Sequence, residues 1–157
     1  MKMALLQTGK TSERHIADGV NMYSTRIRKY TGFEIITIPD IKNNRNMPVT
    51  EQKIREGKKI LESVGRDDYI VLLDEMGKEM RTTEFADWIR KHSMTTGRRT
   101  LFVTGGPWGV SDEVYKASDF RLSLSKMTFP RQLIRLVFME QLYRAFTIIK
   151  GEPYHHE

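Results

Sequence analysis

Two stretches in the C-terminal third decide the fold: TLFVTGGPWG at residues 100–109 and FRLSLSKMTFPRQLIRL at residues 120–136. The first is an apolar strand that ends in a glycine turn. The second is a strand that ends in a loop rich in serine and threonine, followed by a long apolar helix that opens at Pro130. Proline is favoured at a first helical position because it has no backbone N–H to leave unpaired. Each stretch therefore predicts a strand with a glycine-rich or polar loop at its carboxyl end.

Outward from these stretches, strand and helix patterns alternate five times along the chain. The alternation predicts an α/β fold, with a mainly parallel sheet and helices on both faces. A length of 157 residues without a linker or an internal repeat indicates a single domain over residues 1–157. We expect strands at 3–7, 33–38, 69–73, 101–103 and 120–124, and helices that begin near residues 12, 50, 83, 111 and 130.

Two smaller details follow from the same patterns. Thr50 is expected to cap the second helix, with Ile54, Lys58 and Leu61 marking its inward side. The third strand is a continuous apolar run, typical of a strand buried on both faces. We expect it to end in a charged turn at residues 74–78.

The composition excludes several kinds of site and compartment. Without cysteine there is no disulfide, thiolate nucleophile or iron–sulfur cluster, and four histidines without HxxH or HExxH spacing leave little case for a metal. No apolar run approaches the ~20 residues of a membrane helix, and the N-terminus is predicted to be a strand rather than a signal peptide. We therefore expect a cytoplasmic protein without a membrane partner. The net charge of +6 favours a phosphate-rich partner, although many cytosolic domains are mildly basic and bind no nucleic acid.

Three loops should meet where ligands bind in parallel sheets, at the carboxyl ends of the strands. They begin at Leu73, at Gly105 and at Leu124. Glycines let a backbone approach a ligand closely, and serine and threonine add donors and acceptors. Taken alone, GGPWG is also compatible with an ordinary strand-to-helix turn, and it is neither a GxGxxG nor a Walker sequence. Lys126 in the third loop can meet a carboxylate or phosphate, or be simply solvated.

The last helix is apolar around most of its circumference, so it must be covered on most sides. In a chain this small one cover is the sheet, and we expect the other to be a second subunit in a homodimer. Arg135 and Arg144 lie nine residues apart and so on different faces. One is expected to form an interface salt bridge and the other an RNA contact, without an indication of which is which.

The tail GEPYHHE ends the sequence with an aromatic residue and two imidazoles. Terminal residues are often frayed. The alternative is that Tyr154 stacks on a base and His155 or His156 transfers a proton near neutral pH. The two remaining histidines, His15 and His92, lie on predicted helices and are expected at the surface.

The order and spacing of six motifs resemble one family. The chain is similar over its whole length to the SPOUT methyltransferases, and within them to the RlmH family of large-subunit ribosomal RNA pseudouridine methyltransferases. No single motif is unique, but their order and spacing in a chain of this size are highly specific. The motifs are MKMALLQTGK, YIVLLDEMGK, LFVTGGPWG, LSLSKMTFP, RLVFMEQLYRAF and PYHHE.

The resemblance implies a SPOUT-type fold with a C-terminal trefoil knot, in which the last helix threads through a loop. It also implies a homodimer, and S-adenosyl-L-methionine as the cofactor, bound bent in the knot. By matching position, the cofactor-binding residues that it implies are Leu73, Gly105, Leu124, Ser125, Lys126, Met127, Thr128 and Phe129.

The implied reaction is methyl transfer to a ring nitrogen of a pseudouridine in large-subunit (23S) ribosomal RNA, with the assembled ribosome as substrate. Direct displacement onto nitrogen needs alignment and loss of one proton, but no covalent enzyme adduct and hence no cysteine. His155 and Tyr154 are the candidates for the proton chemistry, and Arg144 for a charge stabiliser or RNA anchor. At Arg131 the chain departs from the family pattern, which has a histidine after the proline that closes the cofactor loop. Arginine there can hold a phosphate or the cofactor carboxylate.

Two other functions compete with this one. Arg131 is the best argument for a catalytically impaired SPOUT-fold protein that only binds RNA. A small nucleotide-binding enzyme of metabolism is disfavoured by the lack of a phosphate-loop motif. With no appended RNA-binding module in the sequence, RNA recognition is expected from the basic surface, including Lys42 and Arg45 in an exposed, mobile loop at 40–48, and the pair Arg98 and Arg99.

Overall fold

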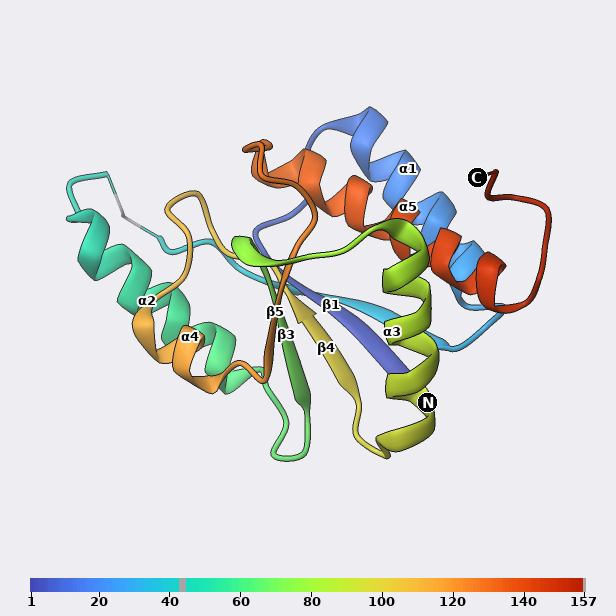
Figure 1. Cartoon of the computed structure of the whole chain (residues 1–157). Coiled ribbons are helices and arrows are strands. Elements are labelled where there is room, and N and C mark those ends of the chain that lie inside the picture. The colour runs from blue at the N-terminus through green and yellow to red at the C-terminus, as the bar shows by residue number, and fades with distance from the viewer. Residues whose placement is uncertain (43–44, 157) are drawn as a thin grey trace.

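Strands and helices alternate strictly in the computed structural model, which describes residues 1–42 and 45–156 (Figure 1). In chain order the elements are β1 (Lys2–Thr8), α1 (Arg14–Ile27), β2 (Gly32–Ile38), α2 (Val49–Glu62), β3 (Tyr69–Glu79), α3 (Thr82–Thr95), β4 (Thr100–Val103), α4 (Asp112–Ala117), β5 (Phe120–Ser123) and α5 (Arg131–Ile149).

The five strands form one sheet in the order β2-β1-β4-β3-β5, and every pair is parallel. The predicted α/β fold with a parallel sheet is confirmed. β4 lies between β1 and β3, so that Thr100 is in register with Met3 on one side and with Tyr69 on the other. Because all strands run the same way, their carboxyl ends and the loops that follow them lie at one edge of the sheet.

Helices cover both faces of the sheet, as expected. α1, α3 and α5 lie on one face, and α2 and α4 on the other (Figure 1). Side chains alternate along a strand, so Leu5 of β1 and Phe102 of β4 join the core under the three helices. Their neighbours Leu6 and Val103 join the core under the two helices.

The last helix is flanked within its own chain. α5 lies beside α1 on one side and α3 on the other, and every residue of α5 is at least partly buried (Figure 1). Much of the cover that its apolar circumference requires thus comes from these helices, and the homodimer stays a prediction. The expectation for Arg135 is wrong in both its alternatives. Its guanidinium is fully buried and donates to the Thr8 carbonyl at 2.7 Å and the Thr11 hydroxyl at 2.8 Å.

The predicted inward side of α2 is only partly right: Leu61 packs against the core, but Ile54 and Lys58 are exposed. The buried residues are Gln52, Glu56, Gly57 and Ile60, whereas Ile54 is 44% exposed. Polar residues occupy half of the buried face, and a search for apolar spacing is biased against such a face. The helix begins at Val49, one residue before the expected cap, and has no side-chain cap. A buried polar face is unusual, and it lies against the loop that follows β4.

Two further expectations need correction. β3 continues through residues 74–78 to Glu79 instead of ending in a turn there, with a register shift against β5 between Leu73 and Lys78. His92 is buried, because its ring stacks on Trp88 and bonds the Thr100 hydroxyl at 2.8 Å. The loop predicted at 40–48 includes residues 43–44, which lie outside the described residues. None of the helices over the described ranges is long and apolar enough to cross a membrane.

Candidate functional site

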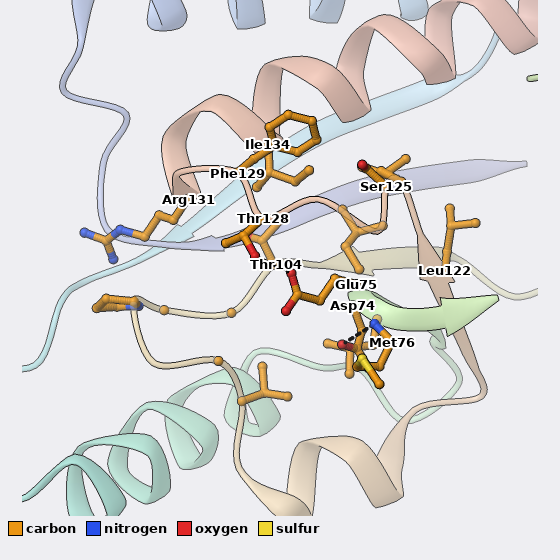
Figure 2. Close-up of a pocket in the computed structure, with 18 of the residues that line it drawn as sticks. Asp74, Glu75, Met76, Thr104, Leu122, Ser125, Thr128, Phe129, Arg131 and Ile134 are labelled. Carbon is orange, nitrogen blue, oxygen red and sulfur yellow. Dashed lines mark hydrogen bonds between the residues drawn. The ribbon is translucent and has the colours of Figure 1, made fainter. Parts of the chain in front are cut away.

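A cavity of about 430 Å³ opens at the carboxyl edge of the sheet, beside the ends of β3, β4 and β5 (Figure 2). Its volume is in the usual range for small-molecule sites. All three loops singled out in the sequence contribute to its walls. The sequence-predicted residues that line it are Leu73, Gly105, Leu124, Ser125, Met127, Thr128, Phe129 and Arg131.

The glycine turn after β4 forms one wall with its backbone. A Cβ atom on Gly105 would lie 2.9 Å from Val110 Cγ1 and 3.0 Å from the Gly109 carbonyl carbon, so any side chain would displace the turn. Gly109 has a φ of +85°, in the left-handed region that favours glycine. Its N–H donates to the Gly106 carbonyl at 3.2 Å and closes the turn. The sequence thus places bare backbone where a ligand can approach it.

Two carboxylates of the opposite wall were missed by the sequence analysis. Asp74 Oδ1 accepts a hydrogen bond from the Met76 N–H at 3.1 Å, as the dashed line in Figure 2 shows, while its Oδ2 is buried without a partner among the described residues. Glu75 Oε2 accepts from the Thr128 hydroxyl at 3.0 Å. Their position directly after a predicted strand was the available signal, but it was interpreted as a charged turn. A buried oxygen of Asp74 and the exposed carboxylate of Glu75 suit a ligand with positive charge or hydroxyl donors.

The mouth of the cavity is unusually apolar for an exposed surface. Met76 is 84% exposed, Trp108 52% and Met127 76%, and all three line the cavity. Leu122 and Ile134, which were not singled out from the sequence, also line the cavity. A collar of large exposed side chains at a cavity mouth is typical of a surface that meets a partner or ligand.

Arg131 lines the cavity but is held by neighbouring groups. Its Nη1 donates to the Thr8 carbonyl and to Asp40 Oδ1, both at 3.2 Å. In Figure 2 the side chain points toward the end of β1 and away from Asp74. Helix α5 begins at Arg131, with Pro130 at the N-cap. Arg131 therefore ties the first turn of α5 to the ends of β1 and β2.

Lys126 is the one cofactor-loop residue of the sequence prediction that does not line the cavity. Its side chain is 80% exposed, and its Nζ lies 3.6 Å from Glu79 Oε1. An ion pair between side chains this exposed contributes little to stability. Its assigned role in cofactor binding stays a prediction.

The tail residues form a second cluster, ordered against the chain's own α1 and α5. Arg144 pairs with Glu140 at 2.6 Å, and its guanidinium carbon lies 4.6 Å from the centre of the Tyr154 ring. Arg144 Nη1 is 3.3 Å from His155 Nδ1, and the Tyr154 ring packs edge-on against Tyr143 at 4.8 Å. Burial first, then a hydrogen bond with Tyr23, raises the pKa of Tyr154, so its phenol stays protonated at neutral pH.

The two predicted sets of residues lie at opposite ends of one helix. The cavity contacts the first turn of α5, whereas the tail returns along its C-terminal half (Figure 1). At 1.5 Å per residue, about 20 Å of helix separates Arg131 from Arg144. Within one chain the structure does not bring Tyr154, His155 and Arg144 to the cavity.

The basic residues proposed for RNA binding fall into two groups. Lys42 and Arg45 are exposed. Arg98 and Arg99 lie at the opposite edge of the sheet and are paired: Arg98 Nε donates to the Asp67 carbonyl at 2.9 Å, and Arg99 Nη2 donates to Asp68 Oδ2 at 2.6 Å. Across residues 1–42 and 45–156, no cluster of three or more His, Asp or Glu side chains is placed to hold a metal ion.

Comparisons with known proteins agree over the full length of the chain. Residues 1–155 match a family model described as predicted SPOUT methyltransferase. The chain is similar to the ribosomal RNA large subunit methyltransferase H of Parabacteroides distasonis, 48% identical over 157 residues and 100% of both chains. It is 47% identical over 156 residues, 99% of each chain, to the protein of the same name from Christiangramia forsetii. The solved structure of a probable methylase family protein from Haemophilus influenzae matches 95% of this chain and 66% of that one, with a TM-score of 0.50 and 10% identity, a likeness of fold alone.

Proposed function

Because the chain belongs to the SPOUT methyltransferase family, we propose that it is an S-adenosylmethionine-dependent methyltransferase that acts on large-subunit ribosomal RNA. The observation that carries the proposal is identity of 45–48% over essentially complete chains with proteins that bear this name. The resemblance noted in the sequence is thereby confirmed. A protein that only binds RNA is not favoured, because these relatives are named as methyltransferases. The trefoil knot stays a prediction.

The cavity fits S-adenosylmethionine. The cofactor is a cation with an ammonium group, a ribose and an adenine, and it supplies a methyl group activated on a sulfonium. Asp74 Oδ2 is buried without a hydrogen bond of normal geometry, although the Asp74 carboxylate also meets the Tyr115 hydroxyl, whose pKa is raised by burial and by Asp74, and the adjacent Glu75 adds a second negative charge. Leu72, Leu122 and the bare backbone of the glycine turn provide apolar and close-fitting walls. In this assignment the acids select positive charge and the walls exclude water from the methyl group.

The finer substrate, a ring nitrogen of a pseudouridine, comes to this chain from the family resemblance. Such a nitrogen loses one proton as it is methylated, so a general base contributes to the reaction. His155 is the tail residue suited to this role, because imidazole is the commonest general base and Tyr154 stays protonated. Arg144 can only donate to His155 Nδ1, so this 3.3 Å contact must open before Nδ1 takes the substrate proton, and Arg144 then offers its positive charge to the substrate.

A homodimer resolves the distance between the cavity and the tail. If two α5 helices pack antiparallel, the start of each helix lies beside the end of the other. Two-fold symmetry repeats this contact, so it occurs at both sites of the dimer. The tail of each subunit then covers the cavity of its partner. The outer side of α5 and the apolar mouth at Met76, Trp108 and Met127 supply surfaces for this contact. We therefore place each active site across the interface.

The function is tested by calorimetry with S-adenosylmethionine and by methyl transfer from labelled cofactor to ribosomes that lack the modification. We expect binding with one cofactor per cavity and incorporation of label into large-subunit RNA. Absence of binding by the folded protein would refute the proposed cofactor. Binding without transfer to ribosomes or to RNA would favour the alternative of an RNA-binding protein.

The shared site is tested by mixing two inactive variants. Gly105→Val blocks the cavity, and His155→Ala removes the proposed base. If the site spans two subunits, co-refolded mixed dimers contain one intact site among their two, and the mixture recovers about a quarter of wild-type activity. If cavity and tail act within one subunit, mixing restores nothing. Doubly substituted protein mixed with wild type provides the control.

A further inference from the structure

Helix α2 presents a carboxyl group to the back of the glycine turn. Glu56 is 3% exposed, and its side chain occupies the space beside Gly106. A Cβ atom on Gly106 would lie 2.2 Å from Glu56 Oε2 and 2.8 Å from Glu56 Cδ. Gly106 lines the cavity, whereas Glu56 does not. The loop backbone at residue 106 is therefore interposed between the carboxyl group and the cavity.

Gly106 has no conformational need for glycine. The described glycines with positive φ are Gly9, Gly109 and Gly151, so the backbone at 106 is one that other residues can adopt. The space that a side chain at 106 would need is filled by the Glu56 carboxyl group, so a larger residue there would have to displace that group. The close fit continues at the next residue, since a Cβ on Gly57 would lie 2.2 Å from Ser111 Oγ. Two adjacent residues of α2 thus fit closely against the two ends of the loop.

The Glu56 carboxyl group is poorly satisfied where it lies. Its Oε1 accepts one long hydrogen bond from Gln52 Nε2 at 3.4 Å, and its Oε2 is buried without a partner among the described residues. Burial raises the pKa of the group, and the Gln52 hydrogen bond and the positive charge of Arg131 lower it. An apolar side chain would stabilise this position more, because an unpaired buried carboxyl destabilises the folded state. The next turn of the helix shows that choice, with Ile60 at 2% exposure.

We propose that Glu56 is a positioning residue for the cofactor: its carboxyl group sets the place of Gly106, and so the shape of the cavity wall, without touching the ligand. The inference rests on the proposed role of the cavity as the S-adenosylmethionine site. It assigns a function to a buried polar face of α2 that core packing does not explain. Cofactor affinity then depends on a residue that the cavity does not contain.

The first test measures cofactor affinity and unfolding in the same variants. Glu56→Gln keeps the volume and the acceptor for Gln52, whereas Glu56→Ala empties the space beside Gly106, and Glu62→Gln on the exposed end of the same helix is the control for the charge change. We expect Glu56→Gln to keep wild-type affinity for S-adenosylmethionine, with an unfolding midpoint equal to or above that of wild type, and Glu56→Ala to weaken binding about tenfold. The KM of Glu56→Ala for the cofactor should rise while its KM for ribosomes stays unchanged. Wild-type affinity in Glu56→Ala would overturn the proposal.

The second test is a double-mutant cycle on the contact itself. Gly106→Ala should weaken cofactor binding at least tenfold, because the new methyl group collides with the carboxyl group and the wall must move. In the Glu56→Ala background the space is free, so adding Gly106→Ala should cost little further affinity. An equal loss in both backgrounds would mean that the methyl group acts otherwise, and would also overturn the proposal.

The controls distinguish failure of the proposed role of Glu56 from failure of the proposal that the cavity binds S-adenosylmethionine. If wild type and Glu62→Gln fail to bind S-adenosylmethionine, the cofactor assignment itself is wrong. If both bind it and the two Glu56 tests show no coupling, only the role of Glu56 is wrong. Binding of S-adenosylhomocysteine, measured alongside, shows whether the effect extends to a neutral ligand, as a change in wall shape requires.

Discussion

The two edges of the same sheet differ in how their polar groups are satisfied. At the edge where the strands begin, Asp68 accepts two hydrogen bonds from Arg99 at 2.9 and 2.6 Å, and Asp119 Oδ2 accepts the Ile70 N–H at 2.8 Å. At the edge where they end, buried atoms lack hydrogen-bond partners among the described residues. These atoms are Gln7 Oε1, Thr8 Oγ1, Glu56 Oε2, Asp74 Oδ2 and Arg135 Nε.

This difference indicates that polar groups at the edge where the strands end serve function at a cost in stability. Polar networks that are complete rigidify a fold, whereas incomplete ones are costly and are found where a ligand or a reaction needs them. At the amino edge the groups named above are paired, although Ser24 Oγ, in the last turn of α1 before β2 begins, is also buried without a partner among the described residues. At the carboxyl edge five such atoms remain, and the proposed cofactor would meet Asp74 there. Substitutions at the two edges should accordingly separate into effects on stability and effects on activity.

The largest effect is expected from His155, which we propose that a second subunit brings to the carboxyl edge. His155→Ala should reduce the rate of methyl transfer by about 100-fold to 10,000-fold, because a general base is lost. Cofactor affinity and the thermal midpoint should stay close to wild type, as measured by calorimetry and by thermal unfolding. His156→Ala, which changes the exposed neighbouring imidazole, is the control. A rate equal to wild type would remove His155 from the mechanism.

The matching substitution at the amino edge should leave chemistry intact and lower stability. Asp68→Asn removes the charge that Arg99 pairs with and leaves a half-buried guanidinium without its nearest carboxylate. We expect the free energy of unfolding to fall by about 3 kcal/mol, measured by urea denaturation. The turnover rate at a temperature where the variant is folded should be unchanged. A loss of activity in the folded variant would contradict the division between the edges.

Lowering the pH should reduce the free energy of unfolding through Asp68, at the edge where the strands begin. The hydrogen bonds from Arg99 lower the pKa of Asp68 below its ordinary value of about 3.9. This contribution to stability is therefore fully present above pH ~4 and is lost as the pH falls through the lowered pKa. Asp68→Asn should remove that part of the acid dependence. The check is to measure the free energy of unfolding of wild type and of Asp68→Asn across about five pH units below neutrality.

A smaller effect is expected where α5 is tied to β1 and β2. Arg131→Ala removes the bonds to Asp40 and to the Thr8 carbonyl, both at 3.2 Å and partly exposed. We expect a loss of about 1 kcal/mol in stability and a few-fold weaker cofactor binding, since the first turn of α5 lines the cavity. Arg131→His, the residue of the family pattern, should retain methyl transfer. If it does not, Arg131 has a role that histidine cannot fill.

The smallest effect on stability is expected at the cavity mouth. Trp108 is 52% exposed, so Trp108→Ala should change the free energy of unfolding by less than about 0.5 kcal/mol. Its effect should appear in the dimerisation constant or in the KM for ribosomes, because an exposed apolar collar has no function in the isolated chain. Sedimentation and steady-state kinetics measure the two. An unchanged value in both would show that the collar meets neither partner.

The sequence predicts the architecture well, because apolar periodicity reports directly on which residues face a core. Parallel strands also bring Leu73, Gly105 and Leu124 to one edge whatever their separation in the chain, so the three cavity loops could be named in advance. Glu56 and His92 could not be found in this way, since both are polar groups buried by tertiary contacts that have no periodic signal. The distance between His155 and the cavity was equally inaccessible, because it depends on the direction in which the tail returns.

In the proposed shared site, helix α5 would be the spacer between the cavity and the tail. From Arg131 to Arg144, at 1.5 Å per residue, the helix sets the separation of cavity and tail at roughly 20 Å. Loops usually absorb insertions and deletions over evolution, but a residue added within this helix would rotate everything beyond it by about 100° and shift it by about 1.5 Å. In a symmetric pair the error would occur in both sites at once. The length of α5 should therefore be among the properties of this chain that vary least.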